Sequence, residues 1–403
     1  MELFWLEHKK LWRKKIVKIC VLLCFVYYVI FGSILSFQWF SFGSSDDYTS
    51  AFGNNFDGYT VIKDSQEYAL SFGGELTDET LQQIVSDYQQ MEADGMEEEL
   101  EKTDWQIVNS WLGTLYPELR DTSNYKTMIS YVDPDKLTGF YERRQQVLDE
   151  FLEISGQVGA EKEFLHQMER KVEKPFHYEW IEGWSTLLGS MVADLGVVMA
   201  LFLGIVLSSL FAGEWHDNTS ALVLTTRNGW GKIALAKILT GFAFTVELFA
   251  LLAVSSIISQ LFFMGTAGWD MPIQNIKLIA VAPMNMLQAE IYEYAFVLLG
   301  AIGFAGIVMF ISAAVKNNVL TLLLSLAVVY GPMMIAEYLP YEMQKALDLI
   351  PLVGSSTDIF RTNTFRIFGK LIWSPYLLIT IPVLIGILCM PFAIKNWSRR
   401  MKA

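Results

Sequence analysis

Cysteine and histidine are scarce in this sequence of 403 residues, which has three of the former and four of the latter. Cys20 and Cys24 lie in the first long apolar run and Cys389 in the last, where cysteine usually acts as a small apolar filler. The polar stretch 41–184 contains no cysteine, so packing without disulfides has to stabilise it. The histidines are scattered and no HExxH or Cys/His cluster occurs, so no metal site is predicted.

The motifs of soluble enzymes are also missing. No GxxxxGK[ST] occurs, so this chain does not itself bind ATP phosphates, and no GxSxG marks a serine nucleophile. No concentrated basic surface lies outside the apolar runs, so nucleic-acid binding is not expected. We therefore predict a protein that is not an enzyme and that carries no cofactor of its own.

What the sequence does have is long hydrophobic runs. Residues 16–40 form a run of 25 residues with one charge, Lys18. Each run is long enough to cross a hydrocarbon core of about 30 Å, and in lipid such segments must be helical. We predict an all-α polytopic membrane protein with six transmembrane helices. After 16–40, the other five runs within residues 187–394 are Leu187–Phe211, Leu239–Phe263, Phe296–Val315, Leu320–Tyr338 and Ile372–Ile394.

Basic residues predict the orientation of these helices. Fourteen lie on one side, in residues 1–18, in 212–237, at Lys316 and in the tail 395–403, against five in the short loops of the other side. By the positive-inside rule the side with more basic residues is cytosolic. We therefore expect a multi-pass protein with cytosolic N- and C-termini.

Residues 1–15 have the pattern of an amphipathic helix that precedes the first span. Phe4, Leu11 and Trp12 cluster at helical spacing, and Lys9 and Lys10 are among the basic residues beside them. This pattern is typical of a helix that lies in the membrane interface and contacts lipid. The alternative is an ordinary charged anchor.

Residues 41–184, which we call the polar domain, form the one long polar segment. They hold 30 acidic and 11 basic residues. Surface acids that maintain solubility explain this charge, although an acidic surface also attracts cationic peptides. A segment of about 140 residues is large enough to bury its own core. We expect an extracellular α-rich (α+β) domain between the first and second transmembrane helices.

Local patterns predict a few elements in the polar domain. Thr77, followed by two acidic residues, is a typical helix N-cap. Asp133-Pro134 predicts the start of a second helix, and Gly159–Val172 predicts a third. Two β-prone runs, Tyr59–Lys63 and Tyr68–Phe72, predict a hairpin.

Two further loops are too short to be domains. Gly265–Glu293 contains two prolines, and Tyr341–Leu371 contains an amphipathic run, Met343–Ile350. From length and amphipathicity we expect both to be interfacial or re-entrant pieces on the side of the polar domain.

The loop between the second and third spans, residues 212–237, is the most informative segment. Asp217 or Asn218 can cap a short helix, Thr219–Leu224, that ends before Asn228-Gly229. A short helix with charges on either side suits docking into the groove of a partner. The alternative is an ordinary connector, which also needs a cap, a turn and positive charges. The candidate coupling residues are Glu214, Asp217, Thr219, Leu222, Thr225 and Arg227.

In this loop the chain resembles the permease subunits of ABC-2-type ATP-binding cassette exporters. Their loop runs as an acidic residue, a small residue followed by Thr, an apolar pair, then Thr/Pro-x-Arg and a Lys. Asn218 stands where Gly is common, and no Pro follows Thr226. The element Gly74–Glu79 also resembles one found in family members with a large insert after the first span. The matching loop residues are Glu214, Thr219, Leu222, Thr225, Thr226, Arg227 and Lys237.

The resemblance implies partners and a mechanism. Two permease protomers, identical or different, would pair with two copies of a cytosolic ABC ATPase subunit that binds ATP and Mg. Closure of the ATPases would push on a coupling helix at Asp217–Leu224 and change the tilt of the spans. The resemblance also implies a bacterial plasma membrane. An antimicrobial or other peptide is the expected substrate, and an ion or a drug is the alternative.

Ionisable residues and glycines within the spans supply further candidates. Asp194 and Glu247 lie at membrane depth, where a carboxyl group either lines a gate or substrate path or is hydrogen-bonded to a neighbouring helix. Gly300, Gly303 and Gly306 permit close helix packing, at a protomer interface or within one protomer.

Three rival functions follow from the same residues. A membrane receptor or sensor would read a ligand with the polar domain, but six spans without a cytosolic output domain disfavour it. An intramembrane hydrolase would need Asp194 and Glu247 in one water-filled cavity. An ion-coupled transporter would be expected to show internal repeats, and none is evident.

Overall fold

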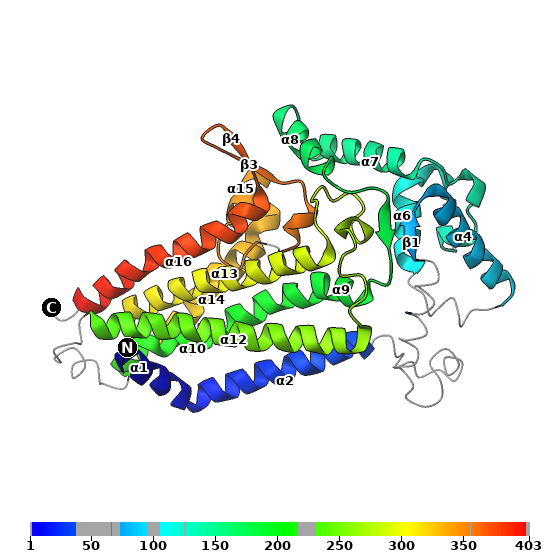
Figure 1. The fold of residues 1–403 in the computed structure, drawn as a ribbon. Helices are drawn as coiled ribbons and strands as arrows, with labels where there is room; N and C mark the ends of the chain where they lie inside the picture. Colours follow the sequence, from blue (N-terminus) through cyan, green and yellow to red (C-terminus); the bar gives the residue numbers. More distant parts are fainter. Residues whose placement is uncertain are drawn as a thin grey trace.

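The computed structural model describes residues 2–37, 66, 73–95, 105–121, 123–124, 126–216, 231–354 and 356–399. In these ranges, five helices are long and apolar enough to cross a membrane, and they run side by side (Figure 1). This arrangement is that of an all-helical membrane protein, as predicted. The five are α10 (Val192–His216), α12 (Lys232–Met264), α13 (Met286–Ala314), α14 (Asn318–Ile335) and α16 (Ser374–Arg399).

The predicted first span begins as a helix, α2 (Lys15–Phe37), which packs along α12. Residues 38–40 lie outside the described residues, so a sixth crossing stays a prediction. The predicted N-terminal helix is α1 (Glu2–Arg13), which also packs on α12. In Figure 1, α1 and the end of α16 lie at one end of the bundle, which we call the terminal end. The polar domain lies at the opposite end, the domain end.

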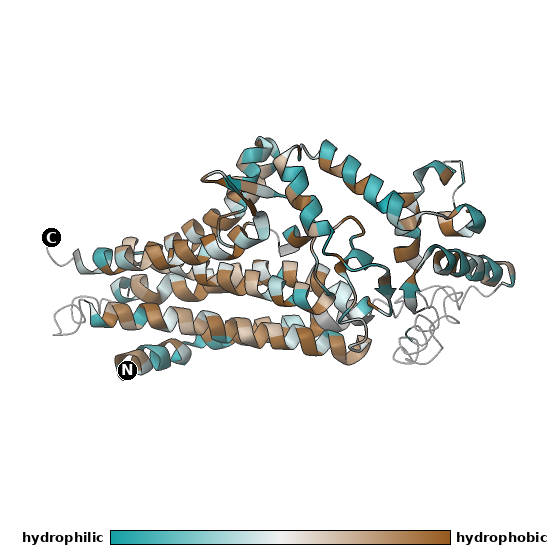
Figure 2. Ribbon diagram, turned by 45° about the horizontal axis from the view of Figure 1, so that its top comes forward, coloured by the Kyte–Doolittle hydropathy of each residue, from teal (hydrophilic) through white to brown (hydrophobic). Residues whose placement is uncertain are grey.

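Hydropathy follows this division. Figure 2 shows the bundle helices mostly in brown and the polar domain and the ends of the bundle mostly in teal. Several bundle side chains at the surface are apolar, for example Ile258 and Phe262 on α12, which are 60% and 72% exposed. Surface of this kind is expected where lipid rather than water surrounds a helix.

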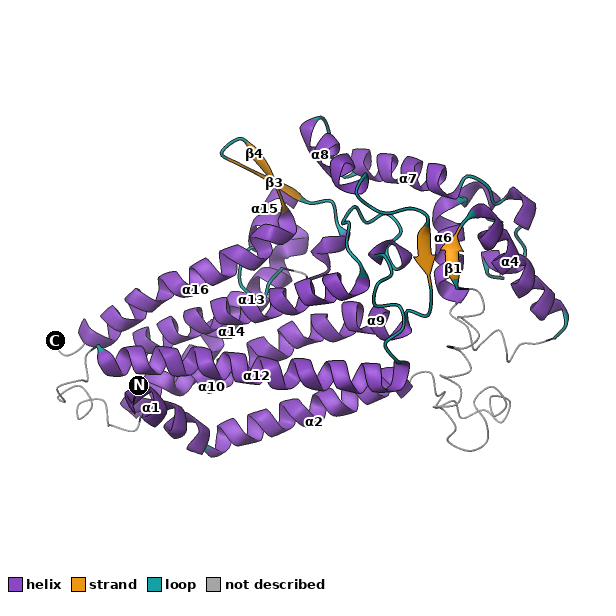
Figure 3. Ribbon diagram, in the orientation of Figure 1, coloured by secondary structure: helices purple, strands orange, loops and turns teal. Residues whose placement is uncertain are grey.

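The polar domain is helical with one short sheet (Figure 3). Strand β1 (Gly74–Leu76) pairs antiparallel with β2 (Phe176–Tyr178), which closes a loop of about a hundred residues. The Thr77 side chain caps the first helix, because its Oγ1 accepts a hydrogen bond from Thr80 N at 3.2 Å. The prediction of a helix start at this position is therefore confirmed. The helices are α4 (Asp78–Ala93), α6 (Trp105–Leu115), α7 (Phe140–Ile154) and α8 (Ala160–Glu169).

Of two further predictions for this domain, one is wrong and the other concerns residues that the structure does not describe. The helix expected from Asp133-Pro134 begins at Phe140, because residues 134–136 form a single 3₁₀ turn and Gly139 has a positive φ of 71°. The start of α7 is instead capped from α4: the Asp78 carboxylate accepts the N–H groups of Gly139 at 2.7 Å and Phe140 at 2.9 Å. The expected hairpin at 59–63 and 68–72 lies outside the described residues.

Several boundaries in the bundle also differ from the predictions. Helix α13 begins at Met286 rather than Phe296, because Asn285 and Gln288 form a capping box. Helix α10 continues to His216 and α12 starts at Lys232, so the loop expected over 212–237 is shorter. The last span starts after a hairpin of β3 (Thr364–Ile367) and β4 (Lys370–Trp373). A short helix, α15 (Tyr341–Leu347), replaces the expected amphipathic run.

The core of the polar domain extends beyond residues 41–184. Leu278, from the loop between α12 and α13, packs into the core of the polar domain. The C-terminal half of α7 contributes Leu148 and Leu152 to a second core, which includes Ile273 of the same loop and Trp373 of β4. The loop 265–285 is therefore part of the polar domain's fold. The sequence did not predict this, because the loop is far from residues 41–184 along the chain.

Arg144 of α7 holds this loop in place. Its guanidinium is fully buried and binds Glu169 of α8 through two hydrogen bonds of 2.5 and 3.0 Å. The remaining donors bind the backbone carbonyls of Leu278 at 2.6 Å and Ala280 at 3.1 Å. Lys174 Nζ adds a third cation–carboxylate contact to Glu169 at 3.0 Å. One planar guanidinium thus joins two helices of the polar domain to a loop of the bundle.

We predict that Arg144→Met lowers the unfolding temperature and frees the loop, since the change leaves the Glu169 carboxylate buried without its main partner. Losing one partner of a buried pair costs about 3–5 kcal/mol. Hydrogen exchange of residues 273–281 should rise in the variant. The control is Arg170→Met, whose side chain is 70% exposed and 3.7 Å from Glu163, and which should behave as wild type. Equal exchange in both variants would contradict the role of Arg144.

Candidate functional site

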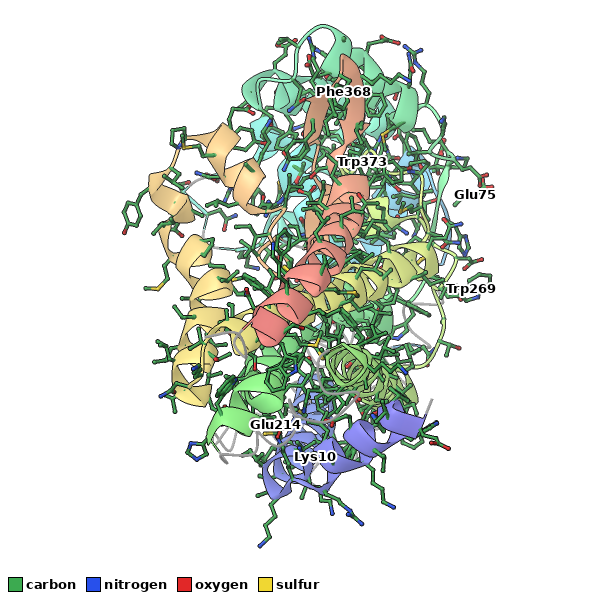
Figure 4. All side chains as sticks on the ribbon, turned by 90° about the vertical axis from the view of Figure 1, so that its left-hand side faces the viewer. Lys10, Glu75, Glu214, Trp269, Phe368 and Trp373 are labelled. Atoms are coloured by element: carbon green, nitrogen blue, oxygen red, sulfur yellow. The ribbon has the colours of Figure 1, made fainter. Side chains whose placement is uncertain are left out.

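A cluster of four charged side chains lies at the terminal end, where α1 meets the end of α10 and the start of α12. Glu214, in the last turn of α10, accepts hydrogen bonds from Lys10 Nζ at 2.5 Å and from Lys237 Nζ at 2.8 Å. Lys237 also donates to Glu7 at 2.8 Å. Figure 4 shows Lys10 and Glu214 close together at this end of the bundle. We call these four residues the terminal charge cluster.

Burial makes this cluster important for the position of the helices. The side chains of Lys237 and Glu214 are only 2% and 5% exposed, whereas that of Lys10 is 52% exposed. Acidic and basic groups alternate from Glu7 through Lys237 and Glu214 to Lys10, so the cluster has no net charge. Removing one member leaves its buried neighbour with an uncompensated charge, which is costly. The three helices are therefore held in one relative arrangement.

Other side chains attach α1 to the same two helices. Lys14 Nζ donates to Ser209 Oγ of α10 at 2.9 Å. On α12, Glu247 accepts a hydrogen bond from Trp12 Nε1 at 3.0 Å, and His8 Nε2 lies 3.2 Å from its other oxygen. Because Glu247 bonds to side chains of α1, the structure favours one of its two predicted roles. That role is a carboxyl group bonded to a neighbouring helix, rather than one that lines a substrate path.

Asp194 has a different neighbour. Its Oδ1 accepts a hydrogen bond from the hydroxyl of Tyr27 on α2 at 3.2 Å. Tyr27 lies about 18 Å along α2 from its start at Lys15, at a rise of 1.5 Å per residue. The partner of Asp194 is therefore well separated from the partners of Glu247, which lie on α1. The two carboxylates contact different helices, which gives no support to a shared catalytic cavity.

Of the predicted coupling residues, the structure describes only Glu214, and it places this residue in a helix instead of the loop. Residues 217–230 lie outside the described residues. Asp217, Thr219, Leu222, Thr225 and Arg227 fall in that segment. The segment leaves α10 within three residues of Glu214 and ends just before α12. The terminal charge cluster is therefore at the base of the predicted coupling segment.

A side chain of α13 bonds to the backbone of α10 beside this cluster. Ser312 Oγ of α13 donates to the carbonyl of Ser208 at 2.7 Å, and it accepts from the N–H groups of Phe211 and Ala212, each at 3.1 Å. A side chain that takes the donors and acceptor of one helical turn is a known cause of helix bending. The last turn of α10, which carries Glu214, follows directly.

The three predicted glycines lie at a contact inside one protomer. There α13 packs against α16 and against the segment that precedes α16. A Cβ on Gly303 would be 2.4 Å from the carbonyl oxygen of Pro382, and one on Gly306 would be 2.6 Å from Gly386. A Cβ on Gly300 would meet Leu352 at 2.9 Å. These glycines allow α13 and α16 to approach backbone to backbone.

We predict that Gly303→Ala lowers the unfolding temperature of the detergent-solubilised protein, because its methyl group overlaps the α16 backbone. Overpacking of this kind costs about 1–3 kcal/mol. The control is Gly331→Ala in α14, where a Cβ meets no atom within 4 Å. Since alanine favours a helix over glycine by about 1 kcal/mol, the control should keep or raise the unfolding temperature. A loss in both variants would contradict close packing at Gly303.

Sequence reasoning missed Glu290 and Glu293. The earlier start of α13 places them one turn apart in a bundle helix, where they are 4% and 0% exposed. Two ionised carboxylates in such surroundings are costly. The signal that locates them is the Asn-x-x-Gln pattern at Asn285, which marks the helix start. Among the described residues no group of three metal-ligating side chains occurs.

Comparisons with protein-family models, with curated proteins and with solved structures found no match to this chain. The resemblance to ABC-2 permeases therefore stays a prediction from the sequence.

We predict that Glu214→Gln and Lys237→Met each destabilise the full chain by about 3 kcal/mol or more, since each leaves a buried charge unpaired. The double variant should lose less than the sum, because it removes both charges together. The control is Lys126→Met, whose side chain is 62% exposed in its pair with Glu92. Thermal unfolding of the four variants tests this, and additive losses would contradict coupling between the two residues.

Proposed function

We propose that this chain is the membrane-spanning permease subunit of an ABC exporter. In this proposal it forms the substrate path, a separate cytosolic ABC ATPase binds ATP and Mg, and a second permease protomer completes the pore. The terminal end faces the cytosol of a bacterial cell, and the polar domain lies outside. The chain itself catalyses no reaction.

The observation that carries the proposal is the Glu214–Lys237 pair. It joins the last turn of α10 to the second turn of α12, and segment 217–230, the proposed coupling segment, connects these two helices. A force on that segment is thus delivered to both helices and, through Glu7 and Lys10, to α1. The turn of α10 whose backbone bonds to Ser312 of α13 is the place where we propose that the force changes the tilt of the helix.

A peptide remains the proposed substrate class, with an ion or a drug as the alternative. Glu290 and Glu293 are added to Asp194 and Glu247 as candidates for the path, because they are buried acids on a bundle helix. A receptor is the second candidate function. The observation that favours it is the continuous packing of the polar domain onto the bundle through Arg144, which suits transmission of a ligand signal.

The test is copurification of the full chain with ABC ATPases of the source cell, followed by ATPase assays. We expect a stable complex with one of them and at least a tenfold loss of bound ATPase in Leu222→Asp, because a carboxylate in the docking helix is not accommodated in an apolar groove. The matched control is Val319→Asp, at the same end of the bundle on a residue that is 66% exposed. It should retain the complex.

Binding of no ATPase by the wild-type chain would overturn the proposal and favour the receptor. Equal loss in both variants would contradict docking through Leu222. Unfolding temperatures of both variants establish that they are folded.

A further inference from the structure

A cleft of about 640 Å³ lies at the domain end, where four parts of the chain meet. Its walls come from α6, from the segment before α10, from the loop 265–285 and from the 3₁₀ turn Ser356–Phe360 with Arg361. Leu278, whose carbonyl group binds Arg144, is one of the residues that line the cleft. The shape of the cleft therefore depends on the Arg144 contact. A volume of several hundred Å³ is typical of small-molecule sites.

The lining is amphipathic. Leu188, Ile279 and Phe360 form apolar wall, and Ser110, Thr114 and Ser185 contribute hydroxyl groups. Leu188 belongs to the start of the candidate span Glu182–His216, so the apolar wall is continuous with a bundle helix. Such a surface fits a molecule with one polar end and one apolar end better than it fits a small ion.

The charged lining residues are both basic. They are Lys277 and Arg361, which are exposed, and none of the described carboxylates lies within the 4.0 Å of an ion pair from either. Asp348 and Asp358 are within electrostatic range of Arg361, and burial raises the pKa of both, to about 6 for Asp348. Two basic side chains in one cleft, with no described carboxylate at ion-pair distance, point to an anionic ligand.

The helix turn beside the cleft is irregular. Residues Leu187–Met191 form a turn of π-helix before α10, and such turns occur frequently at functional sites. Gly189 in this turn lines the cleft, and a Cβ built on it meets no atom within 4 Å. The space in front of Gly189 is therefore open to a ligand, and a larger side chain at this position can fill it.

We propose that this cleft binds an anionic phospholipid, with its headgroup phosphate between Lys277 and Arg361 and its acyl chain along the apolar wall. Lysine and arginine bind phosphate through charge-assisted hydrogen bonds. A free phosphate ion would leave the partly exposed side chains of Ile279 and Phe360 in water, which is why the membrane is the source we favour. This site goes beyond the proposed export function and does not depend on it.

The test is lipid binding to the full chain in neutral detergent, counted by native mass spectrometry. Phosphatidylglycerol and phosphatidylcholine with identical acyl chains are titrated separately, and inorganic phosphate is added as competitor. We expect one phosphatidylglycerol per chain, bound at least tenfold more tightly than phosphatidylcholine. Millimolar phosphate should not displace it.

Two kinds of variant test the assignment. The double change Lys277→Gln with Arg361→Gln should abolish the preference for phosphatidylglycerol, and Gly189→Trp should prevent binding by filling the cleft. The matched control, Arg120→Gln with Lys370→Gln, removes the same charge from exposed residues outside the cleft and should bind as wild type. Unfolding temperatures identify any variant that fails to fold.

Equal binding of the two lipids, or a preference unchanged in the Lys277 and Arg361 variant, would overturn the proposal. Displacement by free phosphate at the concentration of the lipid would identify a small-anion site instead. Loss of ATPase copurification with retained lipid binding would leave this site intact while refuting the export function.

Discussion

The buried guanidinium of Arg144 is the contact on which the rest of the domain end depends. It donates hydrogen bonds to a carboxylate of its own domain and to two carbonyl groups of a loop that belongs to the bundle. A charge this deeply buried is tolerated only when its donors are satisfied, so the domain and the loop must be assembled together. The two cores that follow one another along α7 and the cleft beside Leu278 all include residues of that loop.

Buried ion pairs also stabilise the terminal end, where they join helices of the bundle. There a buried lysine and a buried glutamate join two bundle helices, and partners with more exposure, Glu7 and Lys10, attach α1. Between the two ends the bundle is held mainly by apolar packing and by glycine contacts between α13 and α16. Buried charge contacts therefore lie at both ends of the molecule, and hydrogen bonds such as that of Tyr27 to Asp194 also join bundle helices.

Much of this architecture was predictable from local sequence patterns. The five bundle helices follow from apolar runs, because only a helix satisfies its backbone in lipid. The start of α4 follows from Thr77, a local side chain-to-backbone bond. The start of α7 was not predictable, because its cap is Asp78, more than sixty residues away. Glu214 was recognised as important from its order in the loop, but its partners Lys10 and Lys237 were not paired with it.

Local sequence is enough to say which segments are apolar, how long they are and where helices begin when the cap is local. These are properties of residues within one or two turns of each other, and they need no knowledge of the rest of the chain. Only the tertiary structure decided that a loop after α12 completes the polar domain, that two lysines share Glu214, and that Lys277 and Arg361 line one cleft. Each of those contacts joins residues distant in the chain, and neither hydropathy nor spacing encodes which distant partner a buried charge will meet.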